Sequence, residues 1–247
     1  MSTIISTLRA AGCVFAEDEA RLLTEAAASE AELNTLVDRR AAGEPLEHVL
    51  GWAEFCGLRI AIDPGVFVPR RRTEFLVAQA VMLAPRVVLD LCCGSGAVGA
   101  ALQDAIPGLE LYAADIDPVA VRCARRNVER VYLGDLFDPL PPEPRGRLDV
   151  VVANTPYVPT KEIRLLPPEA RLHEPRVALD GGADGLDIYR RVAAAAPEWL
   201  APGGHLLVET SERQATTATA IAAAAGLTPD LASDGETTVL VATLRVS

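Results

Sequence analysis

The sequence is poor in the residues that proteins use to bind nucleic acids. Lys161 is its only lysine, aromatic residues make up 4% of the chain, and the formal net charge is −11. Phosphate binding depends on clustered lysine and arginine, and base stacking depends on aromatic side chains. We therefore expect no direct contact with nucleic acid.

Cysteine and histidine are too few and too dispersed for a covalent framework or a metal centre. The chain has five cysteines, an odd number without a C-x-x-C pair, and three histidines in separate regions. A disulfide framework needs paired cysteines, and a structural zinc site needs Cys or His ligands at short, regular spacing. The sequence predicts neither, and we expect no metal.

Long apolar runs are absent as well. No stretch approaches the roughly 20 consecutive apolar residues that cross a bilayer, and the N-terminus has no signal-peptide pattern. With 50% hydrophobic and 23% charged residues, the 247-residue chain is nevertheless long and apolar enough to bury a large core. We expect a soluble, cytoplasmic protein with one domain of catalytic size and a smaller accessory part.

Residues 1–50 have the apolar periodicity of short helices. Apolar residues such as Leu33 and Val37 recur at three- and four-residue intervals. Ser29 followed by Glu32 is a capping box that opens the last of three predicted helices. We expect this segment to be a small helical domain.

The pattern changes to alternation beyond the helical segment. Leu58, Ile60 and Ile62 alternate with less apolar positions, which is typical of a strand with one buried face. We therefore predict a β-hairpin in residues 51–72, which links the helical domain to residues 73–247.

Residues 73–247 alternate between strand-like and helix-like runs. The predicted strands are 86–91, 110–115, 131–133, 148–153, 205–209 and 237–245. The predicted helices are 73–84, 97–105, 118–130, 185–200 and 212–225. Such alternation predicts a doubly wound α/β sheet with helices on both faces, in which ligands bind at the carboxyl ends of the strands.

The first strand of this region leads into a glycine-rich loop. Gly94, Gly96 and Gly99 fit the G-x-G-x-x-G pattern of dinucleotide-binding proteins, and Asp115 follows about 20 residues later. Asp90, near the end of the strand, argues against a pyrophosphate, because its carboxylate would repel an anion and attract a cation. The sulfonium and ammonium groups of S-adenosylmethionine fit this charge. Asp115 can accept hydrogen bonds from the ribose of either cofactor.

The strand predicted over 148–153 is followed by a tetrad that places an amide and an aromatic ring at the expected ligand edge. The tetrad is Asn154, Thr155, Pro156 and Tyr157. Here the chain resembles the HemK/PrmC family, class I methyltransferases that modify the side-chain amide nitrogen of a glutamine in peptide-chain release factors. The resemblance covers nearly the whole chain, through Val68-Pro69-Arg70 with Thr73-Glu74, Asp90 to Gly96, Asp115, Gly134-Asp135-Leu136-Phe137, the tetrad, Glu174-Pro175, Ala178-Leu179, Gly181-Gly182 and Asp184-Gly185-Leu186.

The resemblance implies a fold, an activity and a site. The implied fold is a class I, Rossmann-like α/β methyltransferase with a mostly parallel seven-stranded sheet. The implied activity is S-adenosylmethionine-dependent methylation of a release-factor glutamine, with the helical domain docking the protein substrate. The implied cofactor-binding residues are Asp90, Cys92, Cys93, Gly94, Ser95, Gly96, Asp115, Asp135, Leu136 and Asn154. The implied catalytic residues are Asn154, Thr155, Pro156 and Tyr157.

The chemistry of an amide acceptor explains why an asparagine is needed. An amide nitrogen is a poor nucleophile because its lone pair is delocalised into the carbonyl. Hydrogen bonds from its N–H groups to the Asn154 oxygen and to a neighbouring backbone carbonyl would orient the nitrogen and offset the developing charge. We expect Tyr157 to pack against the planar amide and exclude water.

Thr155 and Cys92 depart from the family's usual pattern. The family tetrad is Asn-Pro-Pro-Tyr, so Thr155 keeps the backbone carbonyl of the first proline and loses its rigidity. Cys92 replaces a glycine, and we expect both Cys92 and Cys93 to act as small buried hydrophobes. Related tetrads also serve methyltransferases that act on adenine. Two alternatives therefore stay open: a small-molecule N-methyltransferase on the same scaffold and a non-catalytic module that binds S-adenosylmethionine.

Overall fold

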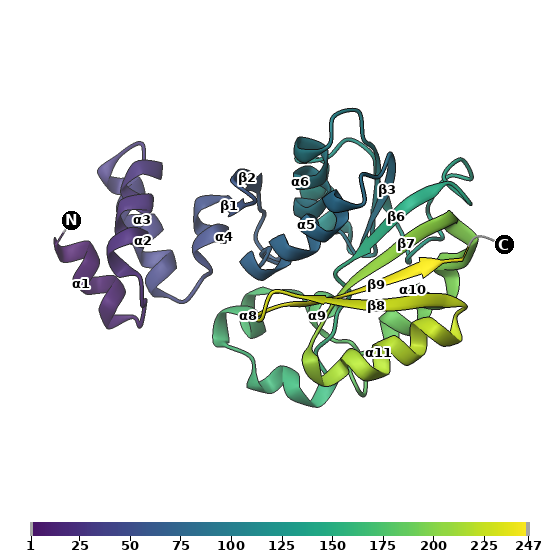
Figure 1. Cartoon of the computed structure of the whole chain (residues 1–247). Helices are drawn as coiled ribbons and strands as arrows, with labels where there is room; N and C mark the ends of the chain where they lie inside the picture. The colour runs from purple at the N-terminus through teal and green to yellow at the C-terminus, as the bar shows by residue number, and fades with distance from the viewer. Residues whose placement is uncertain (1, 246–247) are drawn as a thin grey trace.

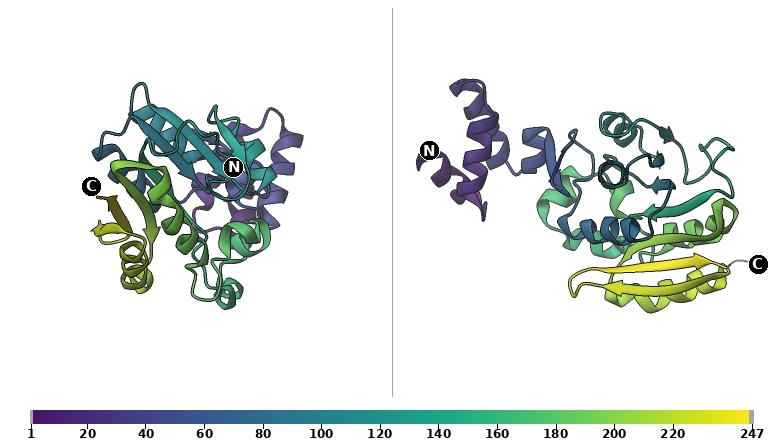
Figure 2. Two further views of the ribbon diagram at one scale, coloured as in Figure 1. Left: turned by 90° about the vertical axis from the view of Figure 1, so that its right-hand side faces the viewer. Right: turned by 45° about the horizontal axis from the view of Figure 1, so that its top comes forward.

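The computed structural model describes residues 2–245. Figure 1 shows a group of helices at the N-terminal end and a large twisted sheet with helices packed around it, with α4, β1 and β2 between the two. In the right-hand view of Figure 2 the N-terminal helices stand away from the sheet. The predicted segments 1–50 and 73–247 include residue 1 and residues 246–247, which lie outside the described residues.

The N-terminal helices pack around a small core of their own. They are α1 (Ser2–Ala10), α2 (Ala16–Ala26), α3 (Glu30–Ala41) and α4 (Leu46–Leu50). The capping box is formed, because Ser29 Oγ accepts from the Glu32 N–H at 3.2 Å and the Glu32 carboxylate accepts from the Ala28 N–H at 2.7 Å. The buried apolar residues of this core are Leu8, Cys13, Ala16, Ala20, Leu23, Val37 and Val49. The sequence predicted three helices here, and α4 is a short additional one.

The hairpin predicted from the alternation is present, and its inner face packs into the core beneath the sheet. Its antiparallel strands are β1 (Trp52–Phe55) and β2 (Leu58–Ala61). Phe55 and Ile60 are fully buried in the core on one face of the sheet. The Asn127 side chain exchanges two hydrogen bonds of 2.9 Å with the backbone of Ala61 and donates to the Ser95 carbonyl at 2.8 Å. The Asn127 side chain thus links the hairpin to the glycine-rich loop.

Over the described part of the chain the large sheet has seven strands, as the family resemblance implies. They are β3 (Val87–Leu91), β4 (Glu110–Asp115), β5 (Val131–Leu133), β6 (Leu148–Ala153), β7 (Leu200–Thr210), β8 (Leu227–Ser233) and β9 (Thr238–Leu244). Their order is β5-β4-β3-β6-β7-β9-β8, and β9 runs antiparallel to both of its neighbours. The strand order reverses between β3 and β6, and this reversal is the place where open α/β sheets bind ligands.

Helices cover both faces of the sheet (Figure 1). One face carries α5 (Glu74–Met82), α6 (Ala97–Ala105) and α7 (Pro118–Ala124), and the other carries α10 (Asp187–Trp199) and α11 (Glu212–Ala224). Neighbouring strand residues pack into different cores, Val88 toward α5 and α6 and Leu89 toward α10. The predicted doubly wound class I methyltransferase fold is confirmed. None of the helices within residues 2–245 is long and apolar enough to cross a membrane.

Three local predictions were wrong or incomplete. The helix predicted over 118–130 ends at Ala124, because the hydrogen bonds of Asn127 to the hairpin and the loop hold the following residues in a turn. The connection from β6 to α10 contains the short helices η2 (Thr160–Leu165), α8 (Pro168–His173) and α9 (Arg176–Leu179), none of which was predicted. Strand β8 was also missed, because Leu227 is its only buried residue and its sequence has no apolar alternation.

Candidate active site

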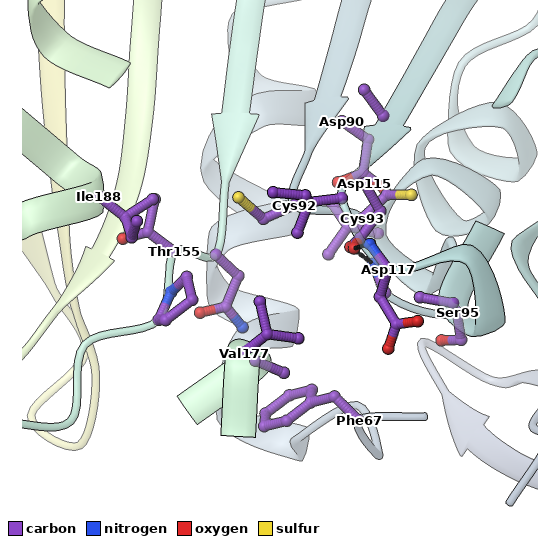
Figure 3. Close-up of a pocket in the computed structure, with 18 of the residues that line it drawn as sticks. Phe67, Asp90, Cys92, Cys93, Ser95, Asp115, Asp117, Thr155, Val177 and Ile188 are labelled. Carbon is purple, nitrogen blue, oxygen red and sulfur yellow. Dashed lines mark hydrogen bonds between the residues drawn. The ribbon is translucent and has the colours of Figure 1, made fainter. Parts of the chain in front are cut away.

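The carboxyl ends of β3, β4 and β6 meet at one pocket. Leu91 lies opposite Ala114 on β4 and opposite Ala153 on β6, so the residues that follow all three strands come together. Every residue of the sequence-predicted site except Gly96 lines this pocket: Asp90, Cys92, Cys93, Gly94, Ser95, Asp115, Asp135, Leu136, Asn154, Thr155, Pro156 and Tyr157. Figure 3 shows part of this lining, with Asp90 and Asp115 on one side and Thr155 on the other.

The glycine-rich loop depends on residues with unusual backbone freedom. Gly94 and Gly96 have positive φ angles of 55° and 77°. Gly96 is the N-cap residue just before α6 and does not line the pocket; a Cβ there would lie 3.0 Å from Val128. A Cβ on Gly99 would lie 2.9 Å from Leu111, so this glycine lets α6 approach the sheet. The glycines therefore shape the loop and bring the first turn of α6 close to the strands.

Asp90 and Asp115 hold the loop through its backbone N–H groups. Asp90 is buried and accepts a hydrogen bond from the Gly99 N–H at 2.8 Å. Asp115 accepts from the Gly94 N–H at 2.8 Å and from the Asp117 N–H at 2.9 Å. Burial, together with the nearby charge of Asp115, raises the pKa of Asp90 to about 7. Burial also raises the pKa of Asp115. Both carboxylates would be more stable beside a cation.

The charge of the pocket lining fits a cationic cofactor better than a pyrophosphate. Its carboxylates are Asp90, Asp115, Asp117 and Asp135. Among the described residues 2–245, Arg191 is the only basic residue in the lining, and its guanidinium is paired with Asp135 at 2.7 Å. Phe67, Val177 and Ile188 add an apolar wall; Figure 3 shows Phe67 and Val177 below the carboxylates and Ile188 across the pocket from them, beside Thr155. Acidic groups beside an apolar wall suit the charged methionine end and the flat base of S-adenosylmethionine.

Cys92 and Cys93 differ in their surroundings. Cys93 is buried, as expected, in the core beneath α5 and α6. Cys92 is only half-buried, because it lines the pocket and packs partly against the opposite core, and it has a positive φ of 58°. The expectation of two buried hydrophobes therefore holds for Cys93 alone. Burial and the nearby carboxylates raise the pKa of both thiols, so neither has the lowered pKa of a nucleophilic cysteine.

The tetrad that follows β6 is held by the loop of residues 181–185. A Cβ on Gly181 would lie 2.5 Å from the Pro156 carbonyl oxygen, which explains a glycine there. Gln214 Nε2, from α11, donates to the Tyr157 carbonyl and to the Asp184 carbonyl, each at 3.0 Å. Packing and hydrogen bonds thus supply the rigidity that a proline at position 155 would otherwise add.

Two polar residues missed as site residues, Thr73 and Arg72, contact the tetrad, and a third, Glu209, binds both of them. Thr73 Oγ1 lies 3.5 Å from Asn154 Nδ2 and donates to Glu209 Oε2 at 2.7 Å. Arg72 donates through Nε to Glu209 Oε1 at 2.9 Å and also bonds to the Tyr157 hydroxyl. Thr73 belongs to the Thr73-Glu74 pair that contributes to the family resemblance. No local sequence pattern marks Glu209, which lies near the end of β7.

The histidines lie in different parts of the fold. His48 Nε2, on α4, is 2.8 Å from the Val66 carbonyl oxygen. His205 Nδ1, on β7, is 3.0 Å from Thr243 Oγ1. Throughout residues 2–245 no group of three or more His, Cys, Asp and Glu side chains is arranged to hold a metal ion.

Sequence comparison identifies methyltransferase relatives. Residues 57–170 match the family described as "Methyltransferase small domain". The chain is 45% identical over 190 residues to the release factor glutamine methyltransferase of Geobacter sulfurreducens. This alignment covers 74% of this chain and 66% of that protein. It is 40% identical over 223 residues to the release factor glutamine methyltransferase of Bradyrhizobium diazoefficiens, covering 85% of this chain and 74% of that protein. The chain thus spans about two thirds to three quarters of the length of these relatives.

Solved structures with the same fold are more distant in sequence. A methyltransferase from Pyrococcus furiosus aligns with a TM-score of 0.58 and 17% identity, over 77% of this chain and 90% of that one. An rRNA methyltransferase of T. thermophilus, in complex with AdoMet and guanosine, aligns with a TM-score of 0.52 and 20% identity, over 76% of this chain and 43% of that one. These likenesses concern the fold alone. The chain is 40% identical to a release factor glutamine methyltransferase that it matches over 74% of that protein's length, and the tetrad lines the pocket at the ends of the strands. The chain therefore belongs to the family of release factor glutamine methyltransferases.

Proposed function

We propose that the protein transfers a methyl group from S-adenosylmethionine to the side-chain amide nitrogen of a glutamine in a peptide-chain release factor. The observation that carries this proposal is the position of Asn154, which lines the same pocket as the carboxylates Asp90 and Asp115. The names of the relatives support the choice of a release factor as substrate. Because release factors act on ribosomes, the proposal also puts the enzyme in the cytoplasm.

The cofactor would be held by the acidic side of the pocket. The loop of residues 92–96 would surround its methionine part, Asp115 would accept from its ribose, and Asp135 and Leu136 would lie at its base. When bound, S-adenosylmethionine supplies a methyl group made electrophilic by the positive sulfur. Asp90 would add a negative charge near the cationic end, buried where water screens it little.

The tetrad would orient the acceptor. The Asn154 side-chain oxygen and the Thr155 backbone carbonyl would accept hydrogen bonds from the two N–H groups of the glutamine amide, which points the nitrogen at the methyl group. As the N–C bond forms and the S–C bond breaks, positive charge develops on the nitrogen, and the two oxygens offset it. One N–H proton would then be lost through the accepting oxygens to solvent beyond the covered amide, and because a protonated amide nitrogen is strongly acidic, no strong base is needed. Tyr157 would cover the planar amide and exclude water.

Residues 1–50 would dock the protein substrate. They have a core of their own, and they stand away from the pocket-forming sheet in Figure 2. The glycine loop and the tetrad are complete without them. A separate helical unit of this kind suits recognition of a surface remote from the modified glutamine.

The proposal is tested with purified protein, purified release factors and isotope-labelled S-adenosylmethionine. Peptide mass spectrometry should locate one added methyl group on a glutamine side chain. Asn154→Ala should abolish most turnover while S-adenosylhomocysteine affinity, measured by calorimetry, changes much less. Transfer to a small molecule with none to any release factor would favour the small-molecule alternative, and undiminished turnover in Asn154→Ala would remove the proposed role of the tetrad.

A further inference from the structure

We propose that Glu209 and Thr73 are positioning residues that fix the orientation of the Asn154 side-chain amide, so that its oxygen faces the acceptor. The inference rests on the proposed role of Asn154 in binding the glutamine amide. It assigns a function to a buried carboxylate and a buried hydroxyl that have no part in the proposed binding of the cofactor.

The three residues form a continuous chain of polar contacts from different parts of the fold. Thr73 ends η1 (Arg71–Thr73) and is 2% exposed, and Glu209 stands on β7 and is 6% exposed. The Thr73 hydroxyl donates to Glu209 Oε2 at 2.7 Å, and Asn154 Nδ2 lies 3.5 Å from Thr73 Oγ1. The first contact is short and buried. The second is long for a hydrogen bond, as catalytic contacts often are before substrate binds.

The donor and acceptor in each of these contacts follow from the single proton of the Thr73 hydroxyl. A threonine hydroxyl has one proton, and here it is donated to the Glu209 carboxylate. Toward Asn154 the Thr73 oxygen is therefore only an acceptor, so it faces the NH2 group of the amide and not the carbonyl oxygen. The Asn154 oxygen is thereby directed away from Thr73 and is free to accept from the substrate. The Glu209 carboxylate thus determines which end of the amide faces Thr73.

Arg72 holds the same carboxylate from the neighbouring position. Its Nε donates to Glu209 Oε1 at 2.9 Å, and its terminal nitrogen bonds to the Tyr157 hydroxyl. Its guanidinium carbon also lies 5.6 Å from the Tyr157 ring centroid. Consecutive residues 72 and 73 therefore each bind Glu209 and each contact one functional residue of the tetrad. The Arg72 side chain is 46% exposed, so the buried arm through Thr73 is the stronger constraint.

Without these hydrogen bonds the Asn154 amide could rotate by half a turn without a steric clash, because its oxygen and its NH2 group have nearly the same size. The rotated amide would present N–H groups to the N–H groups of the substrate. Two donors facing each other cannot bond, so the acceptor would be bound in a poor orientation. The loss would fall on turnover, while the cofactor side of the pocket would be unchanged.

The test compares variants that keep or remove the Thr73 hydroxyl. Thr73→Val keeps the shape and should lower kcat for release-factor methylation about ten- to a hundredfold, with S-adenosylhomocysteine affinity within about twofold of wild type. Thr73→Ser, which restores the hydroxyl, should recover kcat to within about threefold. Glu209→Gln should resemble Thr73→Val, since a neutral amide no longer dictates which way the hydroxyl points.

Thr210→Val is the matched control. Thr210 follows Glu209 on the same strand, is 8% exposed, and its hydroxyl has no hydrogen-bond partner within residues 2–245. This variant should retain wild-type kcat. The inference is overturned if Thr73→Val retains wild-type kcat, if Thr73→Ser fails to recover it, or if cofactor affinity falls by the same factor as kcat.

A measurement on the resting protein separates this inference from the proposed function. In isotope-labelled wild-type protein, NMR should detect a nuclear Overhauser contact between the Asn154 amide protons and Thr73, and Glu209→Gln should weaken it. If the wild-type protein shows this contact but methylates no release factor, the inferred orientation of the Asn154 amide stands and the proposed function is contradicted. If the protein methylates release factors but lacks this contact, the proposed function stands and the positioning role of Thr73 and Glu209 is contradicted.

Discussion

Glu174 accepts a hydrogen bond from the Arg70 guanidinium at 2.5 Å, although 104 residues separate the two in the chain. The same carboxylate oxygen accepts from the Val68 N–H at 3.3 Å, and the Glu174 side chain is only 1% exposed. Phe67 on one connected segment and Val177 on the other both line the cofactor pocket. The ion pair therefore joins two of the segments that contribute apolar residues to the lining of this pocket.

Replacing Glu174 should loosen this part of the lining. Glu174→Ala removes a largely buried, charge-assisted hydrogen bond, and we expect the free energy of unfolding to fall by about 1.5–3 kcal/mol. We also expect S-adenosylhomocysteine to bind several-fold more weakly, because the Phe67 and Val177 segments lose their connection. Urea unfolding and calorimetry measure the two effects, with the exposed Glu129→Ala as control. A loss of stability with unchanged affinity would mean that the ion pair does not shape the pocket.

Cofactor binding should depend on pH through Asp90. Burial raises the pKa of this carboxyl to about 7, and a bound cation favours its ionised form. Below about pH 7 part of the free protein carries the protonated carboxyl, so binding must release a proton and affinity falls as the pH is lowered. We expect S-adenosylhomocysteine, which keeps the ammonium group, to bind up to about tenfold more weakly at about pH 6 than at about pH 8.

Calorimetry in buffers of different ionisation enthalpy measures that proton release directly. Asp90→Asn cannot titrate, so its affinity should be lower than that of wild type at about pH 8 and nearly independent of pH. If Asp90→Asn kept the wild-type pH dependence, another group would be responsible.

The tetrad should tolerate a proline at position 155, the residue that the family resemblance leads us to expect there. The Thr155 N–H donates no backbone hydrogen bond within the described part of the chain, so a proline there removes none. We expect Thr155→Pro to retain turnover within about threefold of wild type. Gln214→Ala should lower turnover more, because it removes the two hydrogen bonds that join the Tyr157 and Asp184 carbonyls. The steady-state rate of release-factor methylation compares the two, and the opposite order would contradict this account of tetrad rigidity.

Removing the helical segment should separate protein recognition from chemistry. The core of the N-terminal helices consists of residues before Gly51, so a chain that begins at Gly51 divides no apolar core, although it loses the contact of His48 with Val66. We expect this shortened chain to bind S-adenosylhomocysteine and to methylate a short glutamine peptide. Its activity on an intact release factor should fall much more. Equal losses on both substrates would mean that the helices support the active site itself.

Much of the sheet could be predicted because local patterns reflect it. The runs 110–115, 131–133 and 148–153 are strands with those bounds in the structure, since buried parallel strands are short apolar runs between polar boundaries. Strand β8 has no such pattern, because it is an edge strand that forms by pairing with β9. The helix predicted over 118–130 was too long because contacts of Asn127 with distant residues outweigh local propensity.

The site divides in the same way. Asp90, Asp115 and Asn154 could be placed together from the sequence, because each lies at or just beyond the end of a parallel strand, and such ends meet at one edge of the sheet. Glu209 could not be connected to Thr73, from which it is separated by 136 residues, because neither residue has a local pattern that names its partner. That contact depends on β7 lying beside β6 in a particular register, and only the assembled sheet determines it.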